Sequence, residues 1–444
     1  MTDDAFGCGS AGLCLCGERF IRNYQTTASE TVDMKTKNRL LLSLMMFLEY
    51  SIWGAWFGVL SVYLGAKGFS GTQIGLIYSL LPVGCMVAPF IIGQLADRYF
   101  DSGKLLAVLH LAGGALLFAM ARMTQYEHLW PTMLAWSILY GPTLALTNSI
   151  CFHHMPEAEK DFGVVRVWGT IGWIVVGLTL SGLRQAAPGL LETLGGADSL
   201  WLAAVLSVVL AVFSLALPST PPARSGVNPW AFITAFRMLK DPQFAIFIAV
   251  SFVVATELMF YYVLTGPFLA TIGIRSARIP AVLTIAQAAE IGTMLALPWM
   301  LTRWGIRKTM LVGILAWPVR YAVFAWGQPW RLVVAALTLH GLCYVCFFTA
   351  SQIYVDKVAP RDIRASAQGL ITFVTLGAGL YFGSLFAGYI SDYFSTASAA
   401  GGTVVNYSKV FLVPLVLTTL CALIFMLTFR ERAWKVEATE SLRD

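Results

Sequence analysis

The chain has 444 residues, of which 57% are hydrophobic and only 12% are charged, and its mean hydropathy is +0.71. Soluble domains carry about 25% charged residues, so this composition excludes an ordinary soluble protein and indicates one that is largely embedded in a membrane. The formal net charge of +6 does not indicate nucleic-acid binding, because its meaning depends on which loops hold the basic residues.

Twelve apolar runs follow a polar N-terminal segment. Residues 1–38 contain no apolar stretch long enough for a signal peptide, and we expect them to form a polar cytoplasmic tail. A helix needs about 20 mostly apolar residues to cross a bilayer. The runs predict transmembrane helices near residues 40–64, 72–95, 104–123, 129–152, 163–183, 199–217, 243–271, 278–301, 308–327, 331–353, 366–390 and 406–429. In the seventh run, Pro267 predicts a segment that is less than fully helical near its end.

The loops between these runs predict the orientation and the division of the chain. With the N-terminus in the cytoplasm, the inner loops hold about three times as many Lys and Arg residues as the outer loops, which fits the positive-inside rule. The longest inner segment is rich in Pro at first and then has the pattern of a short amphipathic helix. We therefore expect a six-helix bundle at 39–217, a cytoplasmic linker at 218–242, a second bundle at 243–429 and a cytoplasmic tail at 430–444. The expected protein is an all-α polytopic protein of the cell's inner membrane, surrounded by lipid, with both termini in the cytoplasm, and it works as a monomer.

The loop after the second run carries a distinctive charge pattern. Its sequence, GQLADRYFDSGK, resembles the signature loop of the major facilitator superfamily through Gly93, Asp97, Arg98, Gly103 and Lys104. In that superfamily the Asp and the basic residues form a cytoplasmic gate between helix ends, and the resemblance implies the same role here. The last Gly and Lys are spaced more widely than usual, and the later stretch RWGIRK resembles a degenerate copy. The alternative is that both stretches are ordinary basic inner loops.

Four further stretches indicate a narrower family. They are LEYSIWGAW at 48–56, KDFGVVRVWGTIGWI at 160–174, the Gln287-x-x-Glu290 pair, and IYVDKVAPRDIRASAQGL at 353–370. Together they resemble the nucleoside:H⁺ symporter family of the major facilitator superfamily, over nearly the whole chain from about residue 36. The resemblance implies the major facilitator fold, with twelve transmembrane helices in two six-helix bundles. It also implies a secondary transporter that carries a nucleoside together with a proton.

Arg166 and Thr170 lie in the fifth run, four residues apart, and therefore share one helix face. Arg166 is about one turn from the cytoplasmic end, so its side chain either extends to the membrane surface or faces the interior of the protein. The family resemblance favours a central cavity, where a guanidinium can hydrogen-bond a substrate or pair with a carboxylate.

Gln287 and Glu290 share a helix face near the middle of the eighth run. A charged residue at the centre of a membrane helix costs about 2.5–3.5 kcal/mol on insertion scales, and a Glu side chain is too short to reach the surface from there. Either Glu290 holds a neighbouring Arg or stays permanently protonated, or it binds and releases a proton during transport. The resemblance implies that both residues line the substrate cavity, and proton coupling is then the expected role of Glu290.

The tenth run places His340, Tyr344 and Phe348 along one helix face. Packing alone explains many aromatic stripes, but the family has two cavity residues at His340 and Tyr344, and aromatic faces suit stacking on a base. The family also has an Asp directly after the second of these residues, whereas this chain has Val345. That difference removes one acidic group from the expected site.

The seventh run also departs from the family pattern. The family contacts its substrate there through two amide side chains, and the equivalent positions here are near Met259 and Tyr262. These residues cannot form the same paired amide hydrogen bonds, although Tyr262 can still bind through its hydroxyl or its ring. Glu257 is either a replacement acidic site for the proton or a packed residue.

The first run has Glu49, Trp53 and Trp56 on one face, with Glu49 about ten residues into the membrane. We expect Glu49 to be a third candidate for proton coupling. It can pair with an interior basic residue such as Arg320, which follows Pro318 in the ninth run. Arg320 can instead hydrogen-bond the backbone carbonyl that this proline leaves free.

The most favoured function is therefore proton-coupled uptake of a nucleoside by alternating access, with no role as an enzyme. The alternative is a major facilitator carrier for another small polar metabolite, sugar or drug, and this alternative includes an exporter. No P-loop is present, which argues against ATP-driven pumping by this chain. We expect no metal and no cofactor other than the coupling proton. Cys343-x-x-Cys346 lacks the two further ligands that zinc needs, and His153-His154, with Glu157 and Glu159 nearby, is expected to belong to a solvated loop.

Overall fold

The computed structural model describes residues 36–88, 100–155, 158–222, 231–360, 363–397 and 403–430, and most of these are helical. In this described part, nine helices are long and apolar enough to cross a membrane. Six of them are the single helices α3 (Gly71–Ala88), α5 (Ser102–Met120), α7 (Ala158–Ala186), α11 (Pro242–Thr271), α12 (Ile279–Trp326) and α18 (Tyr407–Thr428). The first span, Thr36–Ala66, ends in α2 (Leu60–Ala66). The other two are composed of several elements: Trp330–Val358 contains α13 (Trp330–Ala336), α14 (Leu339–Cys343), η3 (Tyr344–Thr349) and α15 (Ala350–Val358), and Ser366–Tyr393 contains most of α16 (Arg364–Thr372), η5 (Phe373–Gly379) and α17 (Leu380–Tyr393).

Each of the twelve predicted segments overlaps a helix of the described structure, although residues 89–95 of the second segment lie outside the described residues. Two of the predicted segments correspond to helices that are not among these nine, namely α6 (Tyr126–His154) and the shorter apolar α9 (Asp198–Ser214). The remaining difference is that α12 contains two predicted segments in one continuous run of 48 residues. Gly305 divides this run because its φ of 76° and ψ of 168° are not helical. A positive φ is a conformation that only Gly adopts readily, so this residue allows the chain to turn between two spans.

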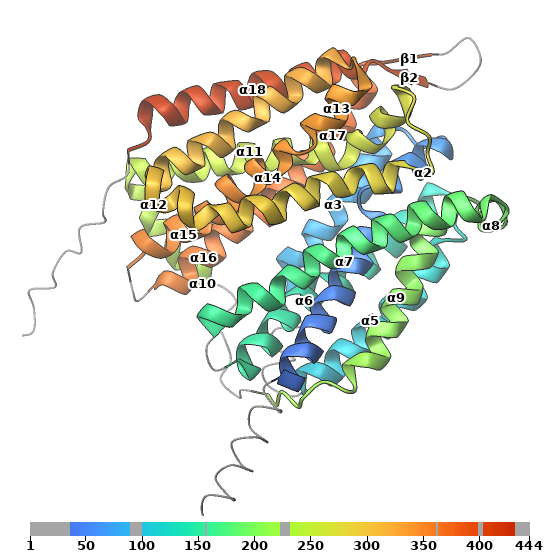
Figure 1. Ribbon diagram of the computed structural model, residues 1–444, viewed down its shortest axis with the longest axis horizontal. Helices are drawn as coiled ribbons and strands as arrows, with labels where there is room; N and C mark the ends of the chain where they lie inside the picture. Colours follow the sequence, from blue (N-terminus) through green and yellow to red (C-terminus); the bar gives the residue numbers. More distant parts are fainter. Residues whose placement is uncertain are drawn as a thin grey trace, which may run out of the picture.

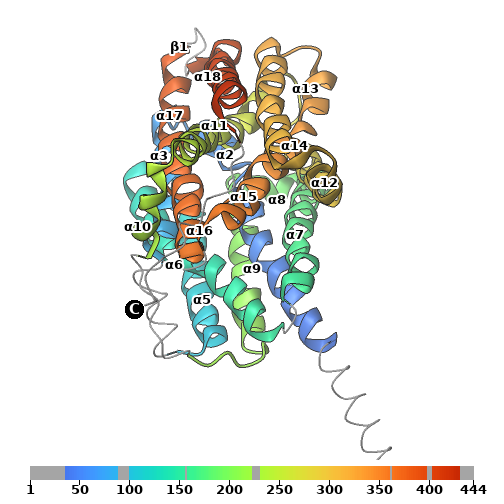
Figure 2. The same cartoon turned by 90° about the vertical axis from the view of Figure 1, so that its left-hand side faces the viewer.

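The two halves of the chain form separate bundles that lie side by side (Figures 1 and 2). In the first half, α5 packs against α6 and α9, and α3 packs against α6. In the second half, α12 packs against α14 and α18, and α11 packs against α17 and α18. Helices α3 and α17 belong to different halves and pack closely against each other, as do α7 and α12.

Short elements mark the two ends of the molecule (Figure 1). At one end lie α8 (Pro188–Thr193) and an antiparallel hairpin of β1 (Ser395–Ala397) and β2 (Thr403–Val405), in which Thr396 pairs with Val404. We call this the hairpin end. At the other end, the linker enters the second half through α10 (Ala231–Thr234) and η2 (Ala235–Lys240), which together agree with the predicted short helix. We call this the linker end.

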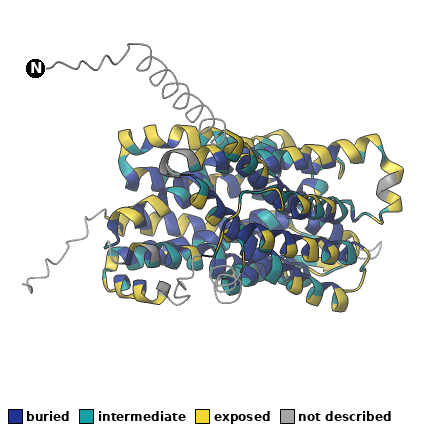
Figure 3. Cartoon of the chain, turned by 90° about the horizontal axis from the view of Figure 1, so that it is seen from below, coloured by how far each residue is buried: buried dark blue, intermediate teal, exposed yellow. Residues whose placement is uncertain are grey.

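The burial pattern is that of a protein surrounded by lipid. Large aromatic side chains such as Trp56, Trp136 and Trp317 are fully buried within the bundles. The outward faces of the helices also carry large apolar residues, among them Leu295, Trp326 and Leu427, which are 80%, 70% and 72% exposed. Figure 3 shows these exposed faces along the outside of both bundles. Contiguous apolar surface of this extent is stable only against hydrocarbon, so it supports the membrane setting.

The expectation that Pro267 interrupts the seventh span is wrong. α11 continues through Pro267 to Thr271, where the backbone N–H of Ile272 closes the helix onto Phe268. A proline removes one backbone hydrogen bond, and membrane helices tolerate this loss where neighbouring segments pack closely. Here Gly266, the preceding residue, lies directly against the carbonyl oxygen of Gly58 in the other half.

Candidate functional site

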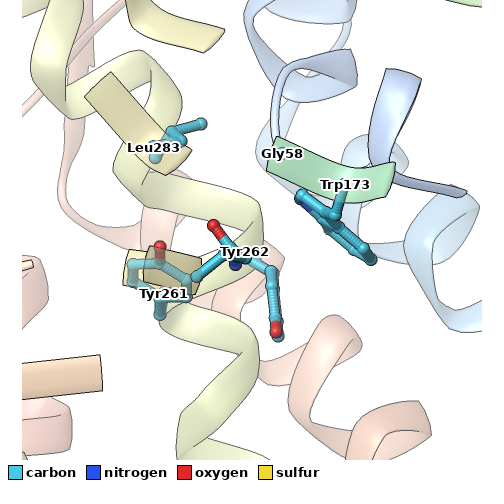
Figure 4. A pocket seen from close by; sticks show the side chains of 6 residues that line it. Gly58, Trp173, Tyr261, Tyr262 and Leu283 are labelled. Atoms are coloured by element: carbon cyan, nitrogen blue, oxygen red, sulfur yellow. The ribbon is translucent and has the colours of Figure 1, made fainter. Parts of the chain in front are cut away.

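Two adjoining pockets lie between the halves of the molecule. The first is lined by Gly58 and Trp173 from the first half and by Tyr261, Tyr262, Leu283 and Gln287 from the second. The second shares Gly58, Trp173 and Leu283 and extends toward Gly177 and Thr284. In Figure 4, Trp173 of α7 and Tyr262 of α11 approach the same space from opposite halves, and their ring centroids are 6.5 Å apart. A pocket shared by two bundles changes shape whenever the bundles move relative to each other.

The first half contributes Arg166 and Thr170 from α7. The Arg166 guanidinium lies over the ring of Tyr50, 3.9 Å from its centroid, and both Arg166 and Thr170 are partly exposed. Gly169 allows this contact, because a Cβ atom at this position would lie 2.7 Å from the Tyr50 ring and 2.8 Å from Nη1 of Arg166. Arg166 is therefore held against the first helix of the chain by a cation–π contact.

The second half contributes Gln287 and Glu290 from the first part of α12. Gln287 is 5% exposed and lines the first pocket, and among the described residues its Oε1 atom has no hydrogen-bond partner. Glu290, one turn further along the helix, is partly exposed. A buried amide oxygen without a partner costs free energy, so a ligand that donates a hydrogen bond there is favoured.

Arg166 and Glu290 come from opposite halves and interact electrostatically. No contact shorter than 4 Å joins them in the part of the chain that the structure describes. Neither residue lines either pocket, so the structure places a cation and an acid from opposite halves near each other without a direct bond between them.

His340, Tyr344 and Phe348 form one continuous aromatic row, as their spacing predicts. The rings of His340 and Tyr344 are stacked with centroids 5.8 Å apart, and Tyr344 and Phe348 are 5.4 Å apart. Tyr344 begins η3, a stretch of π-helix, a wide helical turn that occurs most often at functional sites. His340 also stacks on Tyr261 at 4.7 Å, which connects the row to the pocket. Of the three positions that depart from the family pattern, Val345 and Met259 are fully buried, whereas Tyr262 is partly exposed and lines the first pocket.

Glu257 and Arg320 lie in the interior of the second half and are both 0% exposed. Neither carboxyl oxygen of Glu257 has a hydrogen-bond partner among the described residues. Tyr321 donates its hydroxyl to the backbone carbonyl of Glu257, so the two positions are close, but the carboxyl group does not line either pocket. Arg320 bonds to His340, a contact that the sequence pattern did not reveal.

The suggested pairing of Glu49 with Arg320 is wrong. The Glu49 carboxylate lies inside the first half and contacts Nε2 of His110 at 2.8 Å and the Thr143 hydroxyl at 2.7 Å. His110 in turn contacts the Ser207 hydroxyl at 3.2 Å through Nδ1. This network joins the first helix, α5, α6 and α9. It was not predicted because His110 is 61 residues from Glu49 in sequence and stands alone in an apolar run.

Three of the five residues that resemble the signature loop, Gly93, Asp97 and Arg98, lie outside the described residues. Lys104 is described: it sits exposed in the first turn of α5, and its backbone N–H bonds to Asp101. Asp101 caps this helix and also accepts hydrogen bonds from the Ser219 hydroxyl and the Thr220 N–H at the start of the linker.

A different carboxylate joins the two halves at the hairpin end. Asp392, near the end of α17, accepts hydrogen bonds from the backbone N–H groups of Gly71 and Thr72 at 2.6 and 2.7 Å and from the Thr72 hydroxyl at 2.6 Å. These donors begin α3, where the helix dipole favours a negative charge. Gly71 and Gly388 pack so closely that a Cβ on either would lie under 3 Å from the backbone of the other. The two halves are therefore in direct contact at the hairpin end.

Comparisons with known proteins support one family over nearly the whole chain. The family model described as nucleoside H⁺ symporter matches residues 34–433. The putative nucleoside transporter YegT of Escherichia coli is 37% identical over 413 residues, covering 90% of this chain and 95% of the relative. The nucleoside permease NupG of the same organism is 30% identical, covering 80% of this chain and 88% of its own. The crystal structure of the nucleoside transporter NupG superposes with a TM-score of 0.77 at 27% identity, covering 89% of this chain and 99% of that one.

Proposed function

The chain belongs to the nucleoside H⁺ symporter family, and on this basis we propose that it takes up a nucleoside together with a proton across the membrane. It has the major facilitator fold, and the two halves move about the pockets between them to give access from alternate sides. The observation that carries the proposal is the pocket itself, which aromatic rings from both halves line together with Gln287, whose amide oxygen has no partner among the described residues.

A nucleoside suits the chemistry of this pocket. The flat faces of Trp173, Tyr261 and Tyr262 offer stacking surfaces for a base. Gln287 supplies an acceptor on one side, and Arg166 with Thr170 supplies donors from the other half. Tyr344 and Phe348 extend the aromatic wall. A substrate that bridges the two walls couples its own binding to closure of the halves around it.

Proton coupling is assigned to Glu290. When this carboxyl is charged, it attracts Arg166 across the space between the halves. A bound proton removes that attraction and leaves both groups to interact with the substrate. Glu257 and Glu49 are secondary candidates, because each is fully buried, whereas Glu290 is partly exposed and interacts with Arg166. In this scheme the Glu49 carboxylate holds together the hydrogen-bond network of the first half, and Glu257 is the alternative proton-binding carboxyl in the second half.

The orientation follows from the distribution of basic residues. The linker end, with Arg237 and Lys240 on η2, is assigned to the cytoplasm, and the hairpin end is assigned to the outside. The contact between Asp392 and α3 then closes the outer entrance. In this proposal the contact supports a state in which access from outside is blocked. Both termini are placed in the cytoplasm and the monomer is taken as the working unit.

Uptake into liposomes tests the proposal. The protein is reconstituted, a pH gradient is imposed, and entry of labelled uridine and labelled adenosine is measured with unlabelled sugars as competitors. We expect gradient-dependent uptake of at least one nucleoside that sugars do not inhibit. Uptake that sugars block, or no uptake of either nucleoside by correctly folded protein, would contradict the nucleoside assignment and favour another small polar substrate.

A further inference from the structure

Arg320 is a buried cation whose neighbours are mostly aromatic rings. It is 0% exposed, and its guanidinium lies 4.6 Å from the ring centroid of Tyr261 and 4.5 Å from that of Trp317. Within the described ranges, no Asp or Glu lies within ion-pair distance of it. Its shortest side-chain contact is between Nη1 and Nδ1 of His340, at 3.2 Å. Since a buried guanidinium is costly unless its donors are used, this contact needs an explanation.

The contact fixes the chemical form of the imidazole. A guanidinium has only donors, so the nitrogen of His340 that faces it must accept the hydrogen bond and cannot carry a hydrogen. The ring is then neutral, and its one N–H is on Nε2. The two nitrogens lie on opposite edges of the ring, so this N–H is directed away from Arg320.

The imidazole is also held rigidly in place. It stacks on Tyr261 at 4.7 Å with 25° between the planes, and it meets Tyr262 edge to face at 6.0 Å. The Nε2 atom is buried, and it has no hydrogen-bond partner in the part of the chain that the structure describes. This N–H is therefore available to an acceptor that a ligand brings.

A complementary acceptor lies on the neighbouring helix. Gln287 lines the first pocket together with Tyr261 and Tyr262, the same two rings that contact His340. Its Oε1 atom is buried and is likewise unpartnered among the described residues. One fixed donor and one free acceptor therefore lie around the same pair of tyrosine rings. Because these rings favour a flat partner, the groups are suited to the edge of a base rather than to a ribose.

We propose that Arg320 is a positioning residue that fixes His340 as an Nε2–H donor, and that His340 and Gln287 together recognise a substrate base with adjacent carbonyl and N–H groups. Oxygen-bearing bases of the uracil and hypoxanthine type have this edge. The inference rests on the proposed function, since it specifies the substrate class of the same pocket. It gives a role to Arg320, which the sequence pattern connected only with Glu49 or with the proline before it.

Two variants of His340 test the donor. His340→Gln keeps an N–H donor, whereas His340→Phe keeps the stacked ring and removes the donor. Each is compared for transport of uridine and of zebularine, the uridine analogue that lacks the 4-carbonyl and the N3 hydrogen. One hydrogen bond corresponds to about a two- to tenfold change in affinity. We expect the wild type to prefer uridine, His340→Gln to retain the preference, and His340→Phe to reduce it by this factor through KM. An unchanged preference in His340→Phe overturns the proposal.

Nitrogen-15 NMR of labelled histidine tests the role of Arg320 directly. The chain has five His residues, and the signal of His340 is identified by its loss in His340→Phe. We expect hydrogen on Nε2 alone in the wild type and in Arg320→Lys, and loss of this single form in Arg320→Met. Hydrogen on Nδ1 in the wild type overturns the positioning role. If Arg320→Met does not fold, the wild-type and Arg320→Lys spectra still decide the point.

The two proposals fail in different ways. If the folded wild type neither binds nor transports any nucleoside, the proposed function is wrong, and the base recognition inferred here is wrong with it. The second case is that nucleosides are transported, but adding uridine does not shift the nitrogen-15 signal of His340, and His340→Phe still prefers uridine to zebularine as the wild type does. In that case only the inference about Arg320 and His340 is wrong.

Discussion

Removing the carboxylate of Asp392 is expected to increase the fraction of molecules whose outer entrance is open. In the structure this side chain accepts three hydrogen bonds from the first turn of α3, which belongs to the other half. Hydrogen bonds to charged groups contribute about 1.5–3 kcal/mol each when buried, but Asp392 is partly exposed, so solvent reduces that value. Loss of a helix N-cap costs up to about 2 kcal/mol, and we take this as the effect of Asp392→Ala on closure. That corresponds to a roughly 30-fold shift toward states that are open to the outside.

Thiol accessibility measures this shift. Leu283 lines both pockets, so a Leu283→Cys variant places a thiol at the centre of the pathway. Its rate of reaction with a membrane-impermeant reagent, added from outside, is proportional to the fraction of outward-open molecules. The parent protein without Leu283→Cys gives the background from the native cysteines. Glu192→Ala is the matched control, because Glu192 is an exposed carboxylate at the same end.

We expect Asp392→Ala to raise the reaction rate of the thiol introduced by Leu283→Cys by more than tenfold, and Glu192→Ala to leave that rate nearly unchanged. Equal rates in the two variants would refute the reasoning, since they would show that Asp392 does not hold the halves together. A rise in both would indicate that loss of surface charge, rather than the helix cap, opens the entrance.

Three further outcomes follow from other contacts. Partial burial raises the pKa of Asp101, but hydrogen bonds from Ser219, Lys104, Thr220 and Gly103 outweigh it and hold the pKa below its usual range. Asp101→Ala should therefore lower the unfolding free energy by about 1 kcal/mol at pH 7, and the difference from wild type should shrink as the pH falls through that lowered pKa. Glu49→Ala leaves Nε2 of His110 without its partner in the core and should destabilise the protein by about 1–3 kcal/mol, whereas Glu49→Gln should cost less; thermal unfolding in detergent measures both. Arg166→Lys keeps the charge but not the flat face over Tyr50, and should raise KM for uridine several-fold in uptake assays while stability changes little.

Much of the fold was predictable because the membrane imposes a simple rule on sequence. Each apolar run of about 20 residues became a helix, and even the turn within α12 was expected where RWGIRK interrupts the apolar pattern. The prediction for Pro267 was wrong because a local rule for proline was applied without the neighbouring helix that packs on α11.

The site was predictable where polar residues share a helix face, and was missed where partners are far apart in sequence. The spacing of Gln287 and Glu290, and of His340, Tyr344 and Phe348, placed each set on one face, and the structure agrees. The roles of these residues remain predictions. The contacts of Glu49 with His110, and of Asp392 with the start of α3, join helices that only the folded packing brings together. No periodicity within one helix contains that information.

The most direct test of the account concerns Glu290. Liposomes that contain wild-type protein or Glu290→Gln are loaded with labelled uridine to measure exchange, or given a pH gradient to measure accumulation. If Glu290 carries the coupled proton, the wild type concentrates uridine against its gradient, while Glu290→Gln exchanges uridine but no longer concentrates it. Accumulation by Glu290→Gln at the wild-type level would contradict the assignment of proton coupling to this residue.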